Sequence, residues 1–108
     1  MTEPQITRYT LDAFPYSDNA GIWCINIEER GEDQWAVLWH GYCLNRRTMQ
    51  WDYEPLPSSR TKRFLSTHRF PLDQALALAK NAFPKIKVNG RTAEEVMSWA
   101  PSSRTSKR

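Results

Sequence analysis

The sequence predicts an α+β fold in which a three- or four-stranded antiparallel β-meander packs against two or three C-terminal helices. Residues 22–54 are rich in β-branched and aromatic side chains, and polar turns interrupt them, as in strands joined by hairpins. After residue 60 the apolar residues recur with the spacing of helices. A chain of 108 residues has the length of one domain. We expect residues 1–100 to form this domain and residues 101–108 to be a disordered basic tail.

Four segments of the first half are expected to be extended. The first alternates only weakly and is an optional fourth strand beside the meander. The third is the longest, and prolines at positions 55 and 57 stop the last one. In chain order the segments are 6–11, 22–28, 35–44 and 49–54.

The pairing of these strands follows from their pattern if Glu28 opposes Trp35 and Leu44 opposes Met49. A slip of one residue would turn Asp52 and Glu54 into the core, which is costly. This register predicts that one face forms the core. Its residues are Trp23, Ile25, Ile27, Ala36, Leu38, His40, Tyr42, Leu44, Met49, Trp51 and Tyr53.

The opposite face has an apolar centre formed by Trp35, Val37 and Trp39. Tryptophans ringed by polar groups are typical of interface centres, so these three residues are the predicted partner-binding surface. The alternative is that the N-terminal segment folds over this face and buries it. The residues available for that are Tyr9, Leu11, Phe14 and Tyr16.

The second half predicts helices with identifiable ends. Ser59 is expected to cap a short helix, and Pro71 suits the first position of a helix that runs to about Ala82. Pro84 ends this helix. Thr92 and Glu95 are spaced as a capping box for a last helix over residues 93–99.

The charge is divided unevenly along the chain, although its net value is only +3. Residues 1–59 hold four basic and nine acidic residues, whereas residues 60–108 hold eleven basic and three acidic ones. A basic half can attract an anion, the two halves can neutralise each other in one fold, or a homodimer can pair them head to tail. The first option predicts nucleic-acid binding as the alternative function. Its candidate residues are Arg60, Lys62, Arg63, Arg69, Lys85, Lys87, Arg91, Arg104, Lys107 and Arg108.

A second alternative is a metal-dependent nuclease. Asp52 and Glu54 point to the same side of a strand, and Lys62 or His68 would complete a magnesium site. The prolines that follow the strand argue against it. His40 is expected in the core and His68 in an exposed basic stretch, and neither pattern identifies a catalytic residue.

No other motif predicts chemistry. Cys24 and Cys43 form no zinc-binding pair, and no glycine-rich phosphate loop or nucleophile elbow occurs, so no cofactor, metal or catalytic residue is predicted. The sequence lacks an apolar run that could span a bilayer and a signal-peptide pattern, which predicts no membrane partner and a cytoplasmic location.

A resemblance adds to this interpretation. The stretch from Trp51 to Val96 includes Trp-Asp-Tyr-Glu-Pro-Leu-Pro-Ser-Ser-Arg, His-Arg-Phe and Val-Asn-Gly-Arg-Thr-Ala-Glu-Glu-Val. It resembles small uncharacterised proteins of actinobacteria and their phages. The resemblance implies no activity, but it favours a phage or accessory protein that binds a host component. We therefore expect a non-catalytic binding protein that engages a macromolecule, first a host protein, through the aromatic sheet face.

Overall fold

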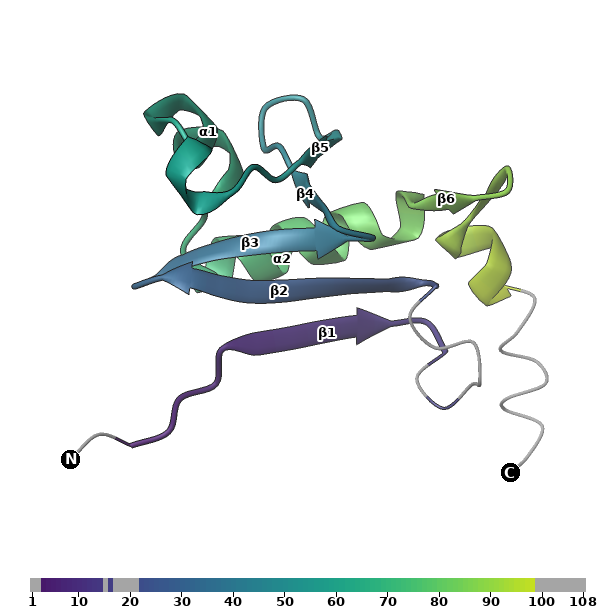
Figure 1. Ribbon diagram of the computed structural model, residues 1–108. Coiled ribbons are helices and arrows are strands. Elements are labelled where there is room, and N and C mark those ends of the chain that lie inside the picture. The colour runs from purple at the N-terminus through teal and green to yellow at the C-terminus, as the bar shows by residue number, and fades with distance from the viewer. Residues whose placement is uncertain (1–2, 15, 17–21, 99–108) are drawn as a thin grey trace.

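The computed structural model describes residues 3–14, 16 and 22–98 and has an α+β fold, as the sequence predicts (Figure 1). A five-stranded antiparallel sheet has the order β1-β2-β3-β4-β5, and β6 and β7 form a separate two-stranded sheet. Residues 93–98 are helical. The strands are β1 (Arg8–Asp12), β2 (Cys24–Gly31), β3 (Gln34–Trp39), β4 (Tyr42–Leu44), β5 (Trp51–Tyr53), β6 (Lys87–Val88) and β7 (Arg91–Thr92), and the helices are α1 (Lys62–His68), α2 (Leu72–Ala82) and the 3-10 turns Pro57–Ser59 and Phe83–Lys85.

The prediction of one long strand over residues 35–44 is wrong, because this segment folds into a tight hairpin. His40 and Gly41 both have positive φ angles, 50° and 81°, and Trp39 pairs directly with Tyr42 across them. Two consecutive residues with positive φ are the pattern of a type I′ turn, which joins antiparallel strands without splaying them. His40 therefore lies exposed in a turn and not in the core, with Nε2 3.2 Å from the carbonyl oxygen of Ile22.

The expected register between the second and third segments is also wrong, by one residue. A bulge between Glu29 and Gly31 makes Trp35 pair with Glu29, and Val37 pairs with Ile27. The extra residue of a bulge shifts the following strand so that its side chains change faces. Trp35 and Val37 consequently share the face of Ile27 and are part of the core.

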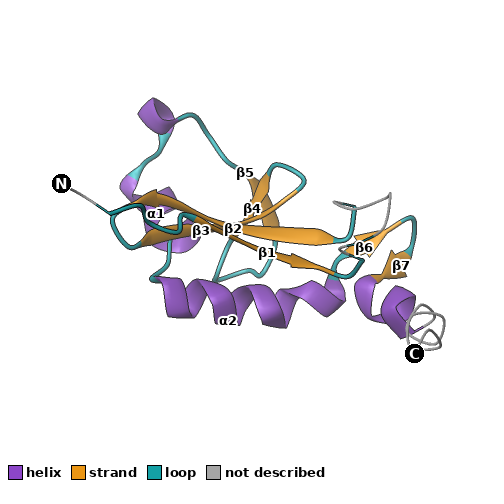
Figure 2. Ribbon diagram, turned by 90° about the horizontal axis from the view of Figure 1, so that it is seen from below, coloured by secondary structure: helices purple, strands orange, loops and turns teal. Residues whose placement is uncertain are grey.

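This core face lies beneath α2, which runs along the sheet (Figure 2). Pro71 precedes α2 with the fixed φ of a helix start, and the 3-10 turn containing Pro84 follows its end. The small residues Ala75 and Ala79 let the helix approach the strands closely, and they are fully buried. The core cluster comprises Ala13, Ile25, Ile27, Trp35, Val37, Leu44, Phe70, Ala75, Ala79, Ala82, Phe83, Ile86 and Ala93.

The opposite face of the sheet has a small second core beneath α1. Phe64 packs there on Ala36, Leu38 and Cys43. Helix α1 begins two residues later than expected, because its N-cap is Thr61 and not Ser59. The Oγ1 atom of Thr61 accepts the Phe64 N–H at 3.1 Å, which is the standard N-cap contact.

The capping box of the last helix is confirmed. The Glu95 carboxylate accepts the Thr92 N–H at 2.8 Å, and Thr92 Oγ1 accepts the Glu95 N–H at 3.2 Å. No helix within the described residues has the length and apolar character needed to cross a bilayer. The predicted tail, with Arg104, Lys107 and Arg108, lies outside the described residues.

Candidate functional site

The predicted partner surface is not exposed. Trp35 and Val37 have exposed fractions of 4% and 0% beneath α2, and Trp39 is half-buried against Trp51, with ring centroids 5.7 Å apart. The ring of Tyr9 in β1 packs against Trp35 with ring centroids 5.7 Å apart. The N-terminal segment therefore contributes to this burial, as the alternative of a covered face predicted. The expectation that these residues form an accessible face is therefore wrong, and its cause is the register of the β2–β3 hairpin.

An ion-pair cluster covers much of the sheet face that carries α1. At its centre Glu54 accepts hydrogen bonds from Arg30, at 3.1 Å to both carboxylate oxygens, and from Arg69, and Arg60 lies 3.5 Å away. The Arg69 side chain is only 4% exposed, and its guanidinium lies 5.3 Å from the centroid of the Phe64 ring. Arg60 also donates to the Pro55 carbonyl oxygen at 2.8 Å. Two of the predicted nucleic-acid contacts, Arg60 and Arg69, are thus engaged within the protein.

The protonation of this cluster follows from its geometry. Burial raises the pKa of Glu54, but the hydrogen bonds and charges of Arg30 and Arg69 outweigh burial and hold that pKa below its ordinary value. The Glu54 carboxylate raises the pKa of Arg30 in turn. Arg30 also donates to Glu28 at 2.9 Å, which extends the cluster to the exposed Arg8 of β1. Glu54 is therefore a carboxylate at neutral pH that already has its cations.

Asp52 is engaged by a different group. Its Oδ2 atom accepts from His68 Nε2 at 2.8 Å and from the Asn45 side-chain amide at 3.2 Å. The hydrogen bond from His68 lowers the pKa of Asp52. Asp52 and Glu54, which the nuclease alternative joined in one magnesium site, thus bind separate partners. No group of three metal-ligating side chains occurs in the part of the chain that the structure describes.

His68 connects β5 to α1 and is buried, contrary to the expectation that it is exposed. Its ring is 5% exposed and stacks on Phe64 with centroids 4.1 Å apart and planes 9° apart. Its Nδ1 atom lies 2.9 Å from the Phe64 carbonyl oxygen and 2.7 Å from Thr67 Oγ1. A carboxylate can only accept a hydrogen bond, so Nε2 carries a hydrogen and donates it in the bond to Asp52. These contacts fix the position of α1 against the β4–β5 hairpin.

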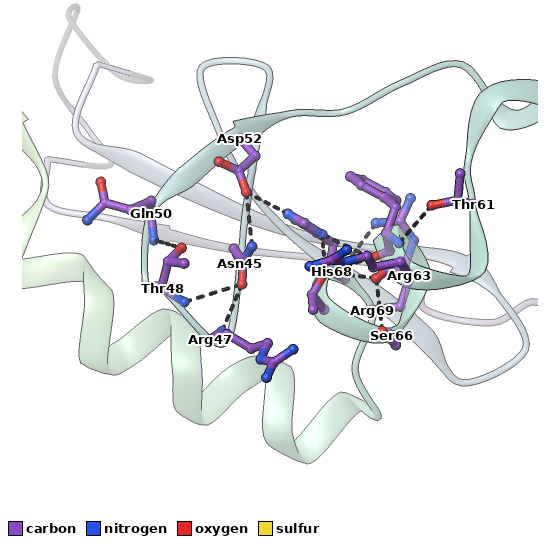
Figure 3. Close-up of polar contacts among 12 residues, drawn as sticks. Asn45, Arg47, Thr48, Gln50, Asp52, Thr61, Arg63, Ser66, His68 and Arg69 are labelled. Carbon is purple, nitrogen blue, oxygen red and sulfur yellow. Dashed lines mark hydrogen bonds and ion pairs between the residues drawn. The ribbon is translucent and has the colours of Figure 1, made fainter.

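Between α1 and the loop that joins β4 to β5 lies a pocket of about 540 Å³. This volume is in the range of small-ligand sites. Figure 3 shows polar contacts of residues from both segments. The loop is held by Asn45, whose side-chain oxygen accepts the N–H groups of Arg47 at 2.8 Å and Thr48 at 3.3 Å. The pocket is lined by Asn45, Arg47, Thr48, Thr61, Arg63, Phe64, Thr67 and His68.

The outward-facing groups of this pocket are hydrogen-bond donors. Thr48 Oγ1 accepts the Gln50 N–H at 3.2 Å, and Thr61 Oγ1 accepts the Phe64 N–H. Each hydroxyl therefore retains its hydrogen for a ligand. Within the described residues the guanidinium groups of Arg47 and Arg63 have no ion pair or hydrogen bond. Because the lining of the pocket holds these two guanidinium groups and no carboxylate, the pocket suits an anion.

Two further unpaired basic residues flank the pocket. Arg46 precedes Arg47 in the loop, its backbone N–H bonds to the Thr67 carbonyl oxygen at 2.9 Å, and its side chain is exposed. Lys62 precedes Arg63 in α1 and is also exposed. We name Arg46, Arg47, Lys62 and Arg63 the unpaired basic group, since no side-chain partner occurs for them within the described residues.

The sequence predicted only half of this group. Lys62 and Arg63 were expected to contact phosphates, whereas Arg46 and Arg47, which lie in the acidic half of the chain, were not among the predicted contacts. The available signal was a pair of arginines in a hairpin loop without an acidic residue within four positions. The other predicted contacts, Lys85, Lys87 and Arg91, lie near β6 and β7 at the opposite end of the molecule from α1 (Figures 1 and 2).

Comparisons with known proteins add no relative: no family model, curated protein or solved structure matches this chain.

Proposed function

We propose that this protein is a non-catalytic nucleic-acid-binding protein that contacts phosphates through the unpaired basic group. The observation that supports this proposal is the pocket between the β4–β5 loop and α1, whose outward groups are donors and whose two arginines lack partners. Arginine binds phosphate oxygens through two parallel N–H groups, which makes it the preferred residue at such sites. The sequence analysis gave nucleic acid as its alternative function, and the geometry favours it over the buried aromatic face.

The arrangement favours the sugar-phosphate backbone over the bases as the recognised part. Phe64 is the aromatic residue of the pocket, but His68 stacks on its ring and the Arg69 guanidinium lies above it. A ring that already packs against an imidazole and a guanidinium has less surface left on which a base can stack. Contacts limited to phosphates carry no sequence information, so we expect binding that depends little on base sequence.

The test is the salt dependence of binding to fluorescein-labelled single-stranded and duplex DNA and to single-stranded RNA, measured by fluorescence anisotropy. Each neutralised phosphate of a single strand contributes a slope of about −0.7 in log K against log salt. The Arg47→Ala, Lys62→Ala, Arg63→Ala triple variant should lose about two units of slope and most of the affinity. These three side chains are exposed, so the variant should fold as the wild type does.

The matched control is the Lys80→Ala, Lys85→Ala, Lys87→Ala triple variant, which changes the net charge equally at exposed positions distant from α1. It should retain most of the affinity. Equal losses in both variants would contradict the assignment to the pocket. The absence of binding to every probe at about 50 mM salt would contradict nucleic-acid binding altogether.

A second candidate function is the host-protein binding that the sequence analysis expected, now placed at another surface. Tyr42 and Tyr53 are cross-strand partners at the edge of the sheet, and their exposed fractions are 47% and 70%. Exposed tyrosine pairs are frequent anchors of protein interfaces. If this candidate is right, the wild type captures a host protein at high salt and the Tyr42→Ser, Tyr53→Ser double variant no longer captures it. The control variant Tyr16→Ser, also at an exposed tyrosine, should still capture it. Capture that survives the double variant would exclude this surface.

A further inference from the structure

We infer that the pocket between the β4–β5 loop and α1 recognises the terminal phosphate of a single-stranded nucleic acid. This inference rests on the proposed function and specifies its ligand. The charge of the pocket favours a terminal phosphate. Arg47 and Arg63 place two positive charges at the pocket, and its lining residues include no carboxylate. A terminal phosphate carries close to two negative charges at neutral pH, whereas a phosphate within the chain carries one.

The number of hydrogen-bond donors at the pocket also favours a terminal phosphate. Two guanidinium groups offer up to ten N–H donors between them, and Thr48 and Thr61 add one hydroxyl hydrogen each. A terminal phosphate presents three acceptor oxygens, one more than an internal phosphodiester. The Thr48 and Thr61 oxygens are already occupied by backbone N–H groups, so neither hydroxyl offers a strong acceptor to a competing cation.

The placement of the donors also favours a terminal phosphate. Arg47, Thr48, Thr61 and Arg63 all line one open pocket of about 540 Å³. An internal phosphodiester needs room for a sugar on both sides, whereas a terminal phosphate needs it on one side only. The unpaired Arg46 and Lys62 flank the pocket and would contact the next phosphates of the strand. A paired duplex end presents its terminus beside a second strand and therefore needs more room than a single strand does.

The experiment compares three single-stranded DNA probes of identical sequence, with a 5′-phosphate, a 3′-phosphate or both ends as hydroxyls, and a fourth probe in which the 5′-phosphate strand lies within a blunt duplex. Anisotropy at constant salt should show about tenfold tighter binding of one phosphorylated single strand than of the hydroxyl probe. The 5′ and 3′ probes identify the end that is bound. Inorganic phosphate and a mononucleotide serve as competitors, and both should displace the phosphorylated strand only at far higher concentration, because they lack the flanking contacts.

Arg47→Ala and Arg63→Ala should each abolish the preference for the phosphorylated end, while Lys87→Ala, the charge-matched control, preserves it. Equal affinity for all single-stranded probes, lost on Arg47→Ala, would overturn the inference and leave the proposed function standing. Displacement by inorganic phosphate at the concentration of the probe would show a site for the free ion and would also overturn it. Binding to no probe contradicts both.

Discussion

The basic residues around the sheet form two groups that are chemically alike and structurally opposite. In the paired group every guanidinium contacts Glu28 or Glu54, whereas in the unpaired basic group none contacts a carboxylate of the described residues. The paired group consists of Arg8, Arg30, Arg60 and Arg69. The difference teaches that the position of two glutamates on one face of the sheet decides which arginines are structural and which remain available to a ligand.

The pairing also explains the charge division along the chain. Arg60 and Arg69 belong to the basic half and Glu54 to the acidic half, and the fold brings them into contact. Part of the charge therefore neutralises internally, which was one of the options that the sequence left open. The charge that remains lies on both halves, since Arg46 and Arg47 come from the acidic one. Counting charges per segment cannot identify this remainder.

The largest expected effect is on the centre of the paired group. Glu54→Gln removes the charge that compensates Arg69, whose side chain is almost fully buried. Breaking a buried ion pair on one side costs about 3–5 kcal/mol, because the remaining charge stays uncompensated. Urea denaturation should show this loss of unfolding free energy. The control Glu32→Gln is an exposed residue without a partner among the described residues, and it should change stability by less than about 0.5 kcal/mol. A loss below about 1 kcal/mol in Glu54→Gln would show that the cluster is solvated.

The sequence predicts the fold well where local signals decide. The prolines around α2 and the Thr92–Glu95 capping box fix helix ends through contacts within four residues, and both are confirmed. The register of the β2–β3 hairpin was not predictable in this way. The bulge at Glu29–Gly31 needs an extra residue, and the turn at His40–Gly41 needs two positive φ angles. An alternating pattern of apolar and polar residues reveals neither. Because both tryptophan-containing faces are apolar, the pattern could not choose between them.

The candidate site was predictable only in part, for a similar reason. Lys62 and Arg63 stand out in a basic segment. The partner loop, with Arg47 and Thr48, lies at least thirteen residues away and meets α1 through the Asp52–His68 contact. That contact depends on tertiary packing, and the sequence suggested the two residues together only as part of the alternative magnesium site. A pocket formed by two segments that are distant in sequence needs their packing to be known.

Acidification should next distinguish the two groups. Glu54 has a lowered pKa in the folded protein, against about 4.3 in the unfolded chain. Because the pKa of Glu54 is lower in the folded protein than in the unfolded chain, its ionised form stabilises the fold. This stabilisation is fully present at pH values above the pKa of the unfolded chain and is lost as the pH falls through the pKa of the folded protein. Thermal unfolding followed by circular dichroism should show a melting temperature that falls below about pH 5. Glu54→Gln should flatten this acid limb, whereas Arg47→Ala should leave it unchanged. Identical acid limbs in wild type and Glu54→Gln would contradict the assignment.

A smaller effect is expected at the edge of the paired group. Arg8 pairs with Glu28 at 2.9 Å, but its side chain is 64% exposed. Exposed ion pairs contribute about 0–1 kcal/mol, because water and salt screen them. Arg8→Ala should therefore lower the unfolding free energy by no more than this, and 1 M salt should remove most of the difference. A loss as large as that of Glu54→Gln would mean that the cluster is coupled as one unit up to its exposed end.

The smallest effect on stability is expected in the unpaired basic group, where the effect on binding is greatest. Arg47→Ala and Arg63→Ala remove no ion pair or hydrogen bond of the described residues, and both side chains are exposed. Their unfolding free energies should stay within about 0.5 kcal/mol of the wild type, as for most surface positions. Urea denaturation beside the anisotropy measurement on the same samples separates the two properties. Lost binding with preserved stability is expected from residues kept for a ligand, whereas lost stability would place these arginines in the paired group.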